Sequence, residues 1–216
     1  KSGLSSFKFL KEENKIYLFD DKKNTNNKEI KKNLISYQKL LNKDVDYIII
    51  SPGIDIYKCK LRGYLKKNLK KIYTDLDIFF NYYPQNKNIT ITGTNGKSTT
   101  ARLLYEVLRD QNFDARLVGN IGNPILLEKK IKNNTIFIIE ASSYQLEYSK
   151  LFRSNISAIL NISPDHLERH KTLKNYIKAK FRLVKNQTKK DHTILNINNL
   201  YIKREVKLQK FLPKII

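Results

Sequence analysis

Apolar residues recur along this chain with two different spacings, and each spacing predicts a different kind of element. Short runs rich in β-branched and aromatic residues are typical of buried strands. Such strands are predicted at residues 16–20, 46–51, 71–74, 88–93, 115–120, 135–140, 156–163 and 192–198. Apolar residues at helical spacing predict helices at residues 28–42, 61–69, 97–111 and 172–185. Strands that alternate with helices predict an α/β fold, in which crossover helices cover a parallel sheet.

A polar segment divides this pattern into two series. The segment YYPQNKN, residues 82–88, contains a proline and interrupts the apolar pattern. We therefore expect one domain over residues 1–82 and a second over residues 83–216. The opening KSGLSSFKFL suits a turn that enters a helix, and the strand that should precede it is missing. The basic residues 203–216 show no clear period, so no element is predicted there.

The segment GTNGKST, residues 93–99, predicts a phosphate-binding loop between a strand and a helix. Its glycines allow backbone N–H groups to converge on an anion at a helix N-terminus, where the helix dipole favours negative charge. Lys97 is expected to reach the terminal phosphates of a nucleotide, and the Ser98 hydroxyl to bind Mg²⁺. The loop is shorter than the usual Walker pattern, which has a glycine where this chain has Ile91. The alternative is a glycine-rich turn with a chance lysine.

Acidic and basic side chains also lie at the ends of two other predicted strands. Glu140 closes an apolar strand, where a carboxylate is costly unless a cation compensates its charge. A Mg²⁺ ion beside a nucleotide would do so, and the alternative is a helix-capping acid. His166 and Asp165 follow the strand at 156–163. Because functional residues of open α/β sheets gather beyond the carboxyl ends of strands, the loop, Glu140 and His166 are expected at one edge.

The histidines of HLERH stand four residues apart, a spacing that holds zinc on some helices. We do not favour zinc for His166 and His170, because no third His or Cys ligand lies nearby in the sequence. A turn that presents Asp165 and His166 to the nucleotide is the preferred interpretation. Nothing in the residue pattern alone distinguishes Lys180 from other lysines on a basic helix face.

Composition changes this picture little. The formal net charge of the 216 residues is +22, which raises nucleic acid as a partner. The lysines are spread among Asn, Ile and Tyr, however, a mixture that an AT-rich genome produces without such a partner. The single cysteine, Cys59, excludes an internal disulfide and suits a reducing compartment. The apolar runs are far shorter than the ~20 residues of a membrane span, so we expect a cytoplasmic protein without membrane insertion.

Five motifs together resemble the Mur ligases of peptidoglycan synthesis. They are GTNGKST (93–99), GNIGNP (119–124), EASSYQLE (140–147), NISPDHLERH (161–170) and YIKAK (176–180). The EASSYQLE block is most similar to the member that adds D-glutamate. SPGI (51–54) and the opening SGLS also resemble the UDP-binding domain of that member. The resemblance implies a partial Rossmann-like first domain that binds the UDP substrate, followed by a P-loop-type central ATPase domain with a mostly parallel sheet.

The same resemblance implies an ATP-dependent, ADP-forming amide ligase. ATP would phosphorylate the carboxylate of UDP-N-acetylmuramoyl-L-alanine, and the amine of D-glutamate would attack the acyl phosphate. The implied cofactors are ATP and two Mg²⁺ ions, and a monomer is expected. Residues expected to hold the nucleotide are Thr94, Asn95, Gly96, Lys97, Ser98 and Thr99.

Further roles follow from the resemblance alone. Lys97, His166 and Lys180 would be catalytic, and Lys180 matches a lysine that the family carbamylates. The implied metal ligands are Ser98, Glu140, His166 and Lys180. The implied contacts to the UDP-linked substrate are Lys22, Asn120, Ser142 and Gln145.

The chain departs from the family pattern at both ends. It begins inside the first glycine turn and ends before the domain that binds D-glutamate, so it resembles a fragment that does not ligate by itself. Three other functions stay open at this point. They are a folylpolyglutamate synthase-like ligase, a generic P-loop NTPase and, least favoured, a nucleic-acid-binding module.

Overall fold

Two separate parallel sheets organise the structure, a computed structural model that describes residues 2–21 and 27–216. The first sheet pairs β1 (Ile48–Ile49) with β2 (Ile72–Tyr73). The second has six strands in the order β4-β5-β3-β6-β7-β8, and its described pairs are all parallel. Its strands are β3 (Asn88–Thr92), β4 (Ala115–Gly119), β5 (Ile136–Glu140), β6 (Ile156–Ile159), β7 (His192–Leu195) and β8 (Lys214–Ile215). The predicted α/β class with a mostly parallel sheet is confirmed.

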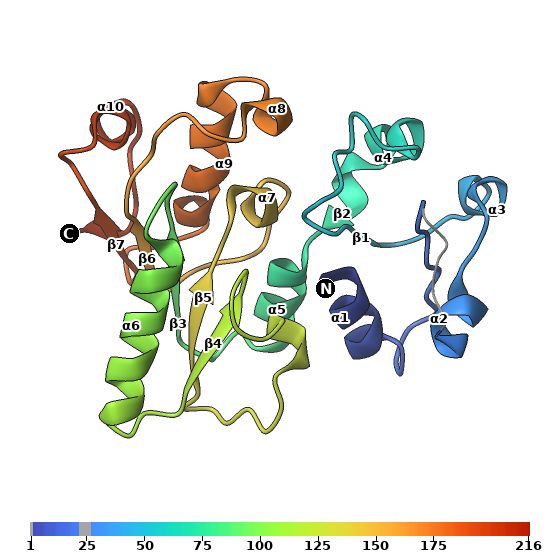
Figure 1. Ribbon diagram of the computed structural model, residues 1–216, viewed down its shortest axis with the longest axis horizontal. Helices are drawn as coiled ribbons and strands as arrows, with labels where there is room; N and C mark the ends of the chain where they lie inside the picture. The colour runs from blue at the N-terminus through green and yellow to red at the C-terminus, as the bar shows by residue number, and fades with distance from the viewer. Residues whose placement is uncertain (1, 22–26) are drawn as a thin grey trace.

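Helices cover both faces of the six-stranded sheet (Figure 1). On one face α6 (Lys97–Asp110) buries Ala101 against Ile91 and Ile138. On the other face α5 (Asp75–Tyr82) packs Phe79 against Phe137. Two more helices, α9 (Leu173–Lys185) and α10 (Leu200–Leu208), cover the β6 and β7 side of that face. Because successive strand residues point to opposite faces, the unbroken apolar run of β5 serves both layers.

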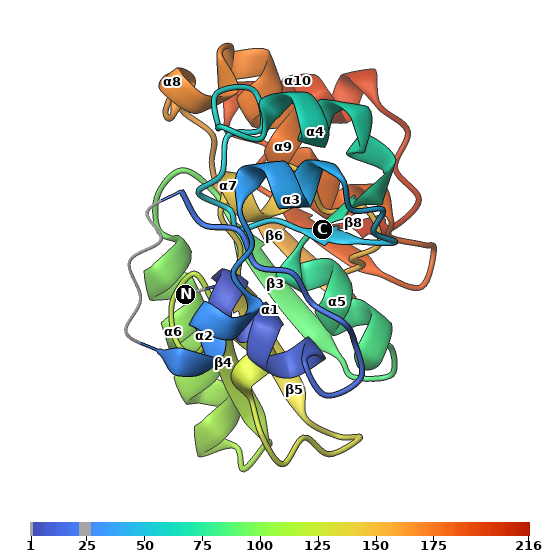
Figure 2. The same cartoon turned by 90° about the vertical axis from the view of Figure 1, so that its right-hand side faces the viewer.

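The first part of the chain lies beside this sheet and has a smaller core. It contains α1 (Ser2–Leu10), α2 (Lys28–Asn33), α3 (Tyr37–Leu41), α4 (Arg62–Lys67) and the 3₁₀ turn η1 (Leu69–Lys71). Figure 2 shows these helices from the front, with α1 next to α5. The core of this part is Ile50, Ile56, Leu65 and Ile72. The two parts meet where α1 packs against α5 and the 3₁₀ turn η2 (Ile125–Leu127).

The proposed boundary near residue 82 separates the two sheets but falls at the end of a helix that both parts share. The apolar side chains of α5 belong to the core of the second sheet. Its Asp75 carboxylate accepts a hydrogen bond of 2.6 Å from the Ser2 hydroxyl of α1. The polar segment after α5 therefore marks a change of sheet, while α5 itself joins the two parts.

Several element predictions need correction. Residues 16–20 do not form a strand, because the segment finds a single backbone partner, through the isolated bridge between Leu18 and Leu34. The helix predicted at 28–42 is two helices, since Leu34 is extended and Ser36 caps α3. The strand predicted at 156–163 ends at Ile159. The C-terminal residues form α10 and β8, which were not predicted. Ile202 is the one buried residue of α10, and both residues of β8 are exposed, so neither element has a clear apolar pattern.

Within the described ranges, no helix is both long enough and apolar enough to cross a membrane.

Candidate functional site

The glycine loop lies at the carboxyl end of β3, in the middle of the six-stranded sheet. β3 has β5 on one side and β6 on the other, so strands that follow β3 in the sequence lie on both sides of it in the sheet. Such a switch point leaves a crevice outside the strand ends. The loop ends at Gly96, whose φ of 81° and ψ of −5° are left-handed, and α6 begins at Lys97. No side chain caps α6, so its first N–H groups are available to an anion.

Neighbouring segments hold this loop in place. The Thr94 hydroxyl lies 3.0 Å from the Tyr176 hydroxyl of α9 and accepts a hydrogen bond of 3.0 Å from the Ser163 amide. Asn161 makes two hydrogen bonds to the backbone of Asn95. Its Oδ1 accepts from the Asn95 amide at 2.9 Å, and its Nδ2 donates to the Asn95 carbonyl at 3.0 Å. The loop is therefore preorganised by the segment after β6 and by α9.

Two lysine ammonium groups lie on the carbonyls of the loop. Lys97 Nζ donates to the Thr94 carbonyl at 2.7 Å, and Lys180 Nζ donates to the Gly93 carbonyl at 2.7 Å. The Lys180 side chain is buried. Burial, and to a smaller extent the nearby positive charge of Lys97, lowers the pKa of Lys180 to about 7, while Asp165 opposes the shift. Positive charge is thus concentrated where a phosphate chain would lie.

Glu140 lies beside the loop at the end of β5, since its register partner on β3 is Ile91. Glu140 is fully buried. The carboxylate Oε1 accepts a hydrogen bond of 2.8 Å from Asn120 Nδ2, whereas Oε2 has no hydrogen-bond partner among the described residues. A buried carboxylate oxygen without a donor is costly. A hard divalent cation, which prefers oxygen ligands, fits this oxygen and the Ser98 hydroxyl of the first turn of α6.

His166 occupies a strained turn after β6. Its φ of 52° and ψ of 33° are left-handed, a conformation that is uncommon for a residue with a Cβ. Its amide donates to Asp165 Oδ1 at 2.8 Å, and its imidazole remains 43% exposed. The short helix α8 (Leu167–His170) starts directly after it.

Aromatic rings connect His166 to the loop. The His166 ring lies 4.9 Å from the Tyr144 ring and 6.2 Å from the Tyr176 ring, measured between centroids. Tyr176 is the residue whose hydroxyl contacts Thr94. His170 stacks on Tyr144 at 5.5 Å, and its Nε2 lies 3.0 Å from the Ser143 hydroxyl. In the described part of the chain, no three His, Cys, Asp or Glu side chains gather into a metal centre by themselves.

The structure places the other predicted site residues as follows. Asn95, Gly96, Ser98 and Thr99 are exposed on the loop and the first turn of α6. Ser142 and Gln145 form a reciprocal capping box at the start of α7 (Ser143–Leu146). Asn120 contacts Glu140. Lys22 lies outside the described residues. Sequence reasoning did not find the bracing roles of Tyr176 and Asn161, although both belong to motifs quoted above.

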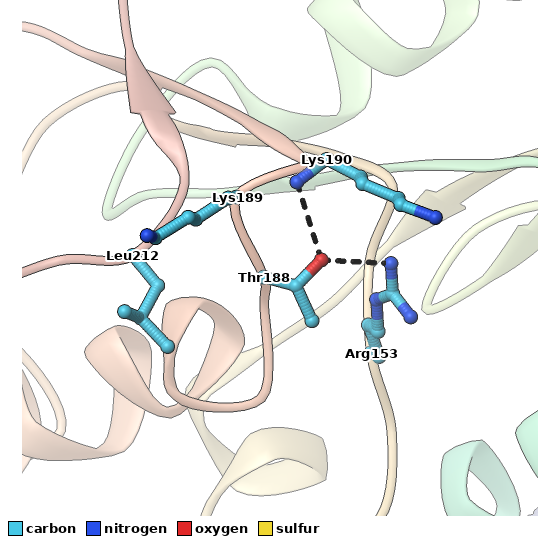
Figure 3. Close-up of a pocket in the computed structure, with 5 residues that line it drawn as sticks. All are labelled: Arg153, Thr188, Lys189, Lys190 and Leu212. Atoms are coloured by element: carbon cyan, nitrogen blue, oxygen red, sulfur yellow. Dashed lines mark hydrogen bonds between the residues drawn. The ribbon is translucent and has the colours of Figure 1, made fainter.

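Two surface pockets lie at different ends of the sheet. The larger, about 430 Å³, is lined by Arg153, Thr188, Lys189, Lys190 and Leu212 (Figure 3). These residues precede β6 and β7 or follow α10, so the pocket lies away from the carboxyl ends of the strands. Its Arg153 is held by Thr188 and by a salt bridge of 2.8 Å to Asp191. The pocket therefore belongs to a separate part of the surface.

The second pocket lies next to the candidate site. It has a volume of about 260 Å³ and is lined by residues of both parts of the chain. These are Gly53, Asp55, Lys58, Tyr144, Glu168 and Arg169. Tyr144 belongs to the aromatic group around His166, so this pocket opens between the turn after β1 and the His166 turn.

The sequence also matches a known protein family. Residues 91–213, more than half of its length, match the Mur ligase middle domain. The chain belongs to the Mur ligase family. This finding confirms the resemblance carried by the five motifs.

Curated relatives agree with this assignment. The chain is 38% identical over 213 residues to the UDP-N-acetylmuramoylalanine–D-glutamate ligase of Caldicellulosiruptor bescii, an alignment that covers 92% of the chain and 46% of the relative. It is 37% identical over 215 residues to the ligase of the same name from Lachnoclostridium phytofermentans, covering 94% of the chain and 47% of the relative. The chain thus spans about half the length of the curated relatives it matches.

A solved structure shows the same fold. The UDP-N-acetylmuramate:L-alanyl-gamma-D-glutamyl-meso-diaminopimelate ligase from Neisseria meningitides matches with a TM-score of 0.55 and 14% identity. The match covers 79% of this chain and 57% of that one. The Mur ligase fold is therefore present over most of the chain.

Gly119 positions Asn120 against Glu140, and its replacement by alanine should be strongly destabilising. Gly119 has a φ of 106°, and an added Cβ would lie 2.4 Å from the Glu140 carbonyl oxygen. We expect Gly119→Ala to lower the free energy of unfolding by about 3 kcal/mol, from backbone strain and overpacking. Gly63→Ala is the matched control, because no atom lies within 4 Å of its added Cβ. It should raise stability by about 0.5 kcal/mol. Equal midpoints of urea unfolding for Gly119→Ala and Gly63→Ala would contradict this prediction.

His170 should make stability depend on pH. Burial, followed by the charges of Arg169, His166 and Lys180, lowers its pKa from 6.5 to about 4, and Glu168 opposes this shift. A depressed pKa means that the unfolded chain binds the proton more tightly, so stability is lost as pH falls from 6.5 towards 4. For this residue we expect about 2 kcal/mol less stability at pH 5 than at pH 7.5.

The measurement is urea unfolding across that pH range for the native chain and for His170→Asn. The asparagine keeps a hydrogen-bonding group near Ser143 but does not titrate. Its stability should change less with pH than that of the native chain. Parallel pH profiles for the two proteins would show that His170 is not the responsible group.

Proposed function

We propose that this chain forms the nucleotide-binding part, and part of the UDP-substrate-binding region, of an ATP-dependent ligase that adds D-glutamate to UDP-N-acetylmuramoyl-L-alanine. The curated relatives bear the name of that activity. The observation that carries the proposal is the pairing of a braced glycine loop with the buried, half-satisfied carboxylate of Glu140. In the proposed reaction the substrate carboxylate takes the γ-phosphoryl group of ATP, and the D-glutamate amine then displaces phosphate.

The chain's own charged groups suit the approach of two anions. Lys97 would hold the β- and γ-phosphates, because it lies at the start of α6 beside the loop carbonyls. Ser98 and Glu140 would hold one Mg²⁺, and His166 a second. When bound, Mg²⁺ offsets the repulsion between the triphosphate and the carboxylate. The strained backbone of His166 supports a functional role for that turn.

Lys180 would become a metal ligand through carbamylation. A lysine reacts with CO₂ as the neutral amine, and a pKa of about 7 leaves a large neutral fraction at neutral pH. Carbamylation would replace a cation next to Lys97 by an anion, and so relieve the repulsion between the two ammonium groups. The burial of Lys180 against the Gly93 carbonyl supports this proposal.

The UDP-linked substrate would cross from the first part of the chain to the loop. Asn120, Ser142 and Gln145 lie on the segments after β4 and β5 and would contact its muramoyl portion. The pocket of about 260 Å³ between the two parts lies on this path. We further propose that the protein is a cytoplasmic monomer with no specific nucleic-acid partner.

Calorimetric titration with Mg·ATP tests the nucleotide site. The chain should bind Mg·ATP saturably, and Lys97→Ala should weaken the affinity by at least about tenfold, because one phosphate-pairing charge is lost. Lys207→Ala removes an exposed lysine of α10 and should leave the affinity unchanged. A parallel titration with duplex DNA should show weak binding that disappears with salt. Tight DNA binding without saturable Mg·ATP binding would contradict the proposal.

A further inference from the structure

One arginine joins the two parts of the chain beside the candidate site. Arg169 lies on α8, three residues after His166, and its side chain is 8% exposed. Its Nε and Nη2 donate to Glu147 Oε2 at 3.0 and 2.8 Å. Its Nη2 also donates to the Ile54 carbonyl at 2.7 Å. A single guanidinium therefore links the turn after β1, the end of α7 and the helix that follows His166.

Aromatic rings fix the plane of this guanidinium. It lies 5.3 Å from the Tyr144 ring centroid and 6.0 Å from the Tyr148 ring centroid. Tyr144 also packs against His166. A second, longer contact supports the same junction, because Lys58 Nζ of the first part donates to the Glu168 carbonyl at 3.5 Å. Arg169 is thus in contact with Tyr144, a ring that packs directly against His166.

The two turns that Arg169 joins are both at carboxyl ends of parallel strands. Residues 51–54 follow β1 of the small sheet, and residues 160–166 follow β6 of the large sheet. Ligands of open α/β sheets bind outside such ends. Breaking a buried ion pair between arginine and a carboxylate strongly destabilises a protein. Lysine cannot replace the arginine, because it lacks the planar guanidinium with several fixed donors. The distance between the two turns therefore depends on this side chain.

We propose that Arg169 is a positioning residue that holds the 51–54 turn of the first part in register with the His166 turn of the second. It sets the UDP-linked ligand of one turn against the nucleotide and its metal at the other. This inference rests on the proposed function for the identity of the two ligands. The junction itself follows from the contacts of Arg169 with Ile54 and Glu147.

Hydrogen exchange tests the junction without any ligand. In Arg169→Lys, the amides of Ser51, Gly53, Ile54 and residues 165–170 should exchange at least about tenfold faster, whereas those of β3 and β5 should not change. Glu147→Gln should act in the same direction. Arg102→Lys is the matched control, because Arg102 pairs with Glu106 at 3.6 Å on the exposed face of α6. Unchanged exchange at both turns in Arg169→Lys would overturn the proposal.

A binding linkage separates positioning from general stabilisation. In the native chain, a non-hydrolysable Mg·ATP analogue should change the Kd for UDP-N-acetylmuramoyl-L-alanine by about fivefold or more. In Arg169→Lys this ratio should fall to about one. A full native ratio in the variant would overturn the proposal, as would no linkage in the native chain. If neither ligand binds, the proposed function fails, and the exchange experiment still decides the junction.

Discussion

The burial of the Glu140 carboxylate is the constraint on which the rest of the site depends. Oε1 is satisfied by Asn120, and Oε2 has no donor within the described chain. Three neighbouring features meet at this residue. Gly119 allows the tight turn that delivers Asn120, β3 brings the loop alongside, and α6 packs over the same face of the sheet. A cation at this place would satisfy the carboxylate and attract a triphosphate to the uncapped start of α6.

The lysines raise a complementary electrostatic problem. Lys97 and Lys180 lie close enough that one charge lowers the pKa of the other. Both ammonium groups donate hydrogen bonds of 2.7 Å to carbonyl oxygens of the loop, and these oxygens partly compensate their positive charge. The strain at His166 and the network through Tyr176 and Arg169 then fix a second turn opposite them. Each turn of the site is thus tied by hydrogen bonds to another segment of the chain.

The central half of the fold was predictable because its strands and helices have strong, long patterns. β3, β5 and α6 lie where the apolar runs and the amphipathic helix pattern put them. The first part was less predictable, since its paired strands are two residues long and residues 16–20 make a single bridge. The C-terminal α10 has one fully buried residue, which leaves little apolar signal for a helix.

The site was predictable in part. Motifs placed the loop, Glu140 and His166 at strand ends, and topology brings those ends to one edge. Side-chain partners such as Tyr176 with Thr94, or Arg169 with Ile54, depend on residues 82 and 115 positions apart, which no local pattern encodes. The motifs therefore predict which residues lie at the strand ends, and tertiary packing supplies the contacts that brace them.

The most direct test of the central claim is a crystal structure of this chain with Mn²⁺ and a non-hydrolysable ATP analogue, in which anomalous scattering locates the metal. We predict a metal peak about 2–2.5 Å from both the Ser98 hydroxyl and a Glu140 carboxylate oxygen. The phosphates should lie on the amides of the glycine loop. A metal peak beyond coordination distance of Glu140, with that carboxylate still half-satisfied, would contradict the account.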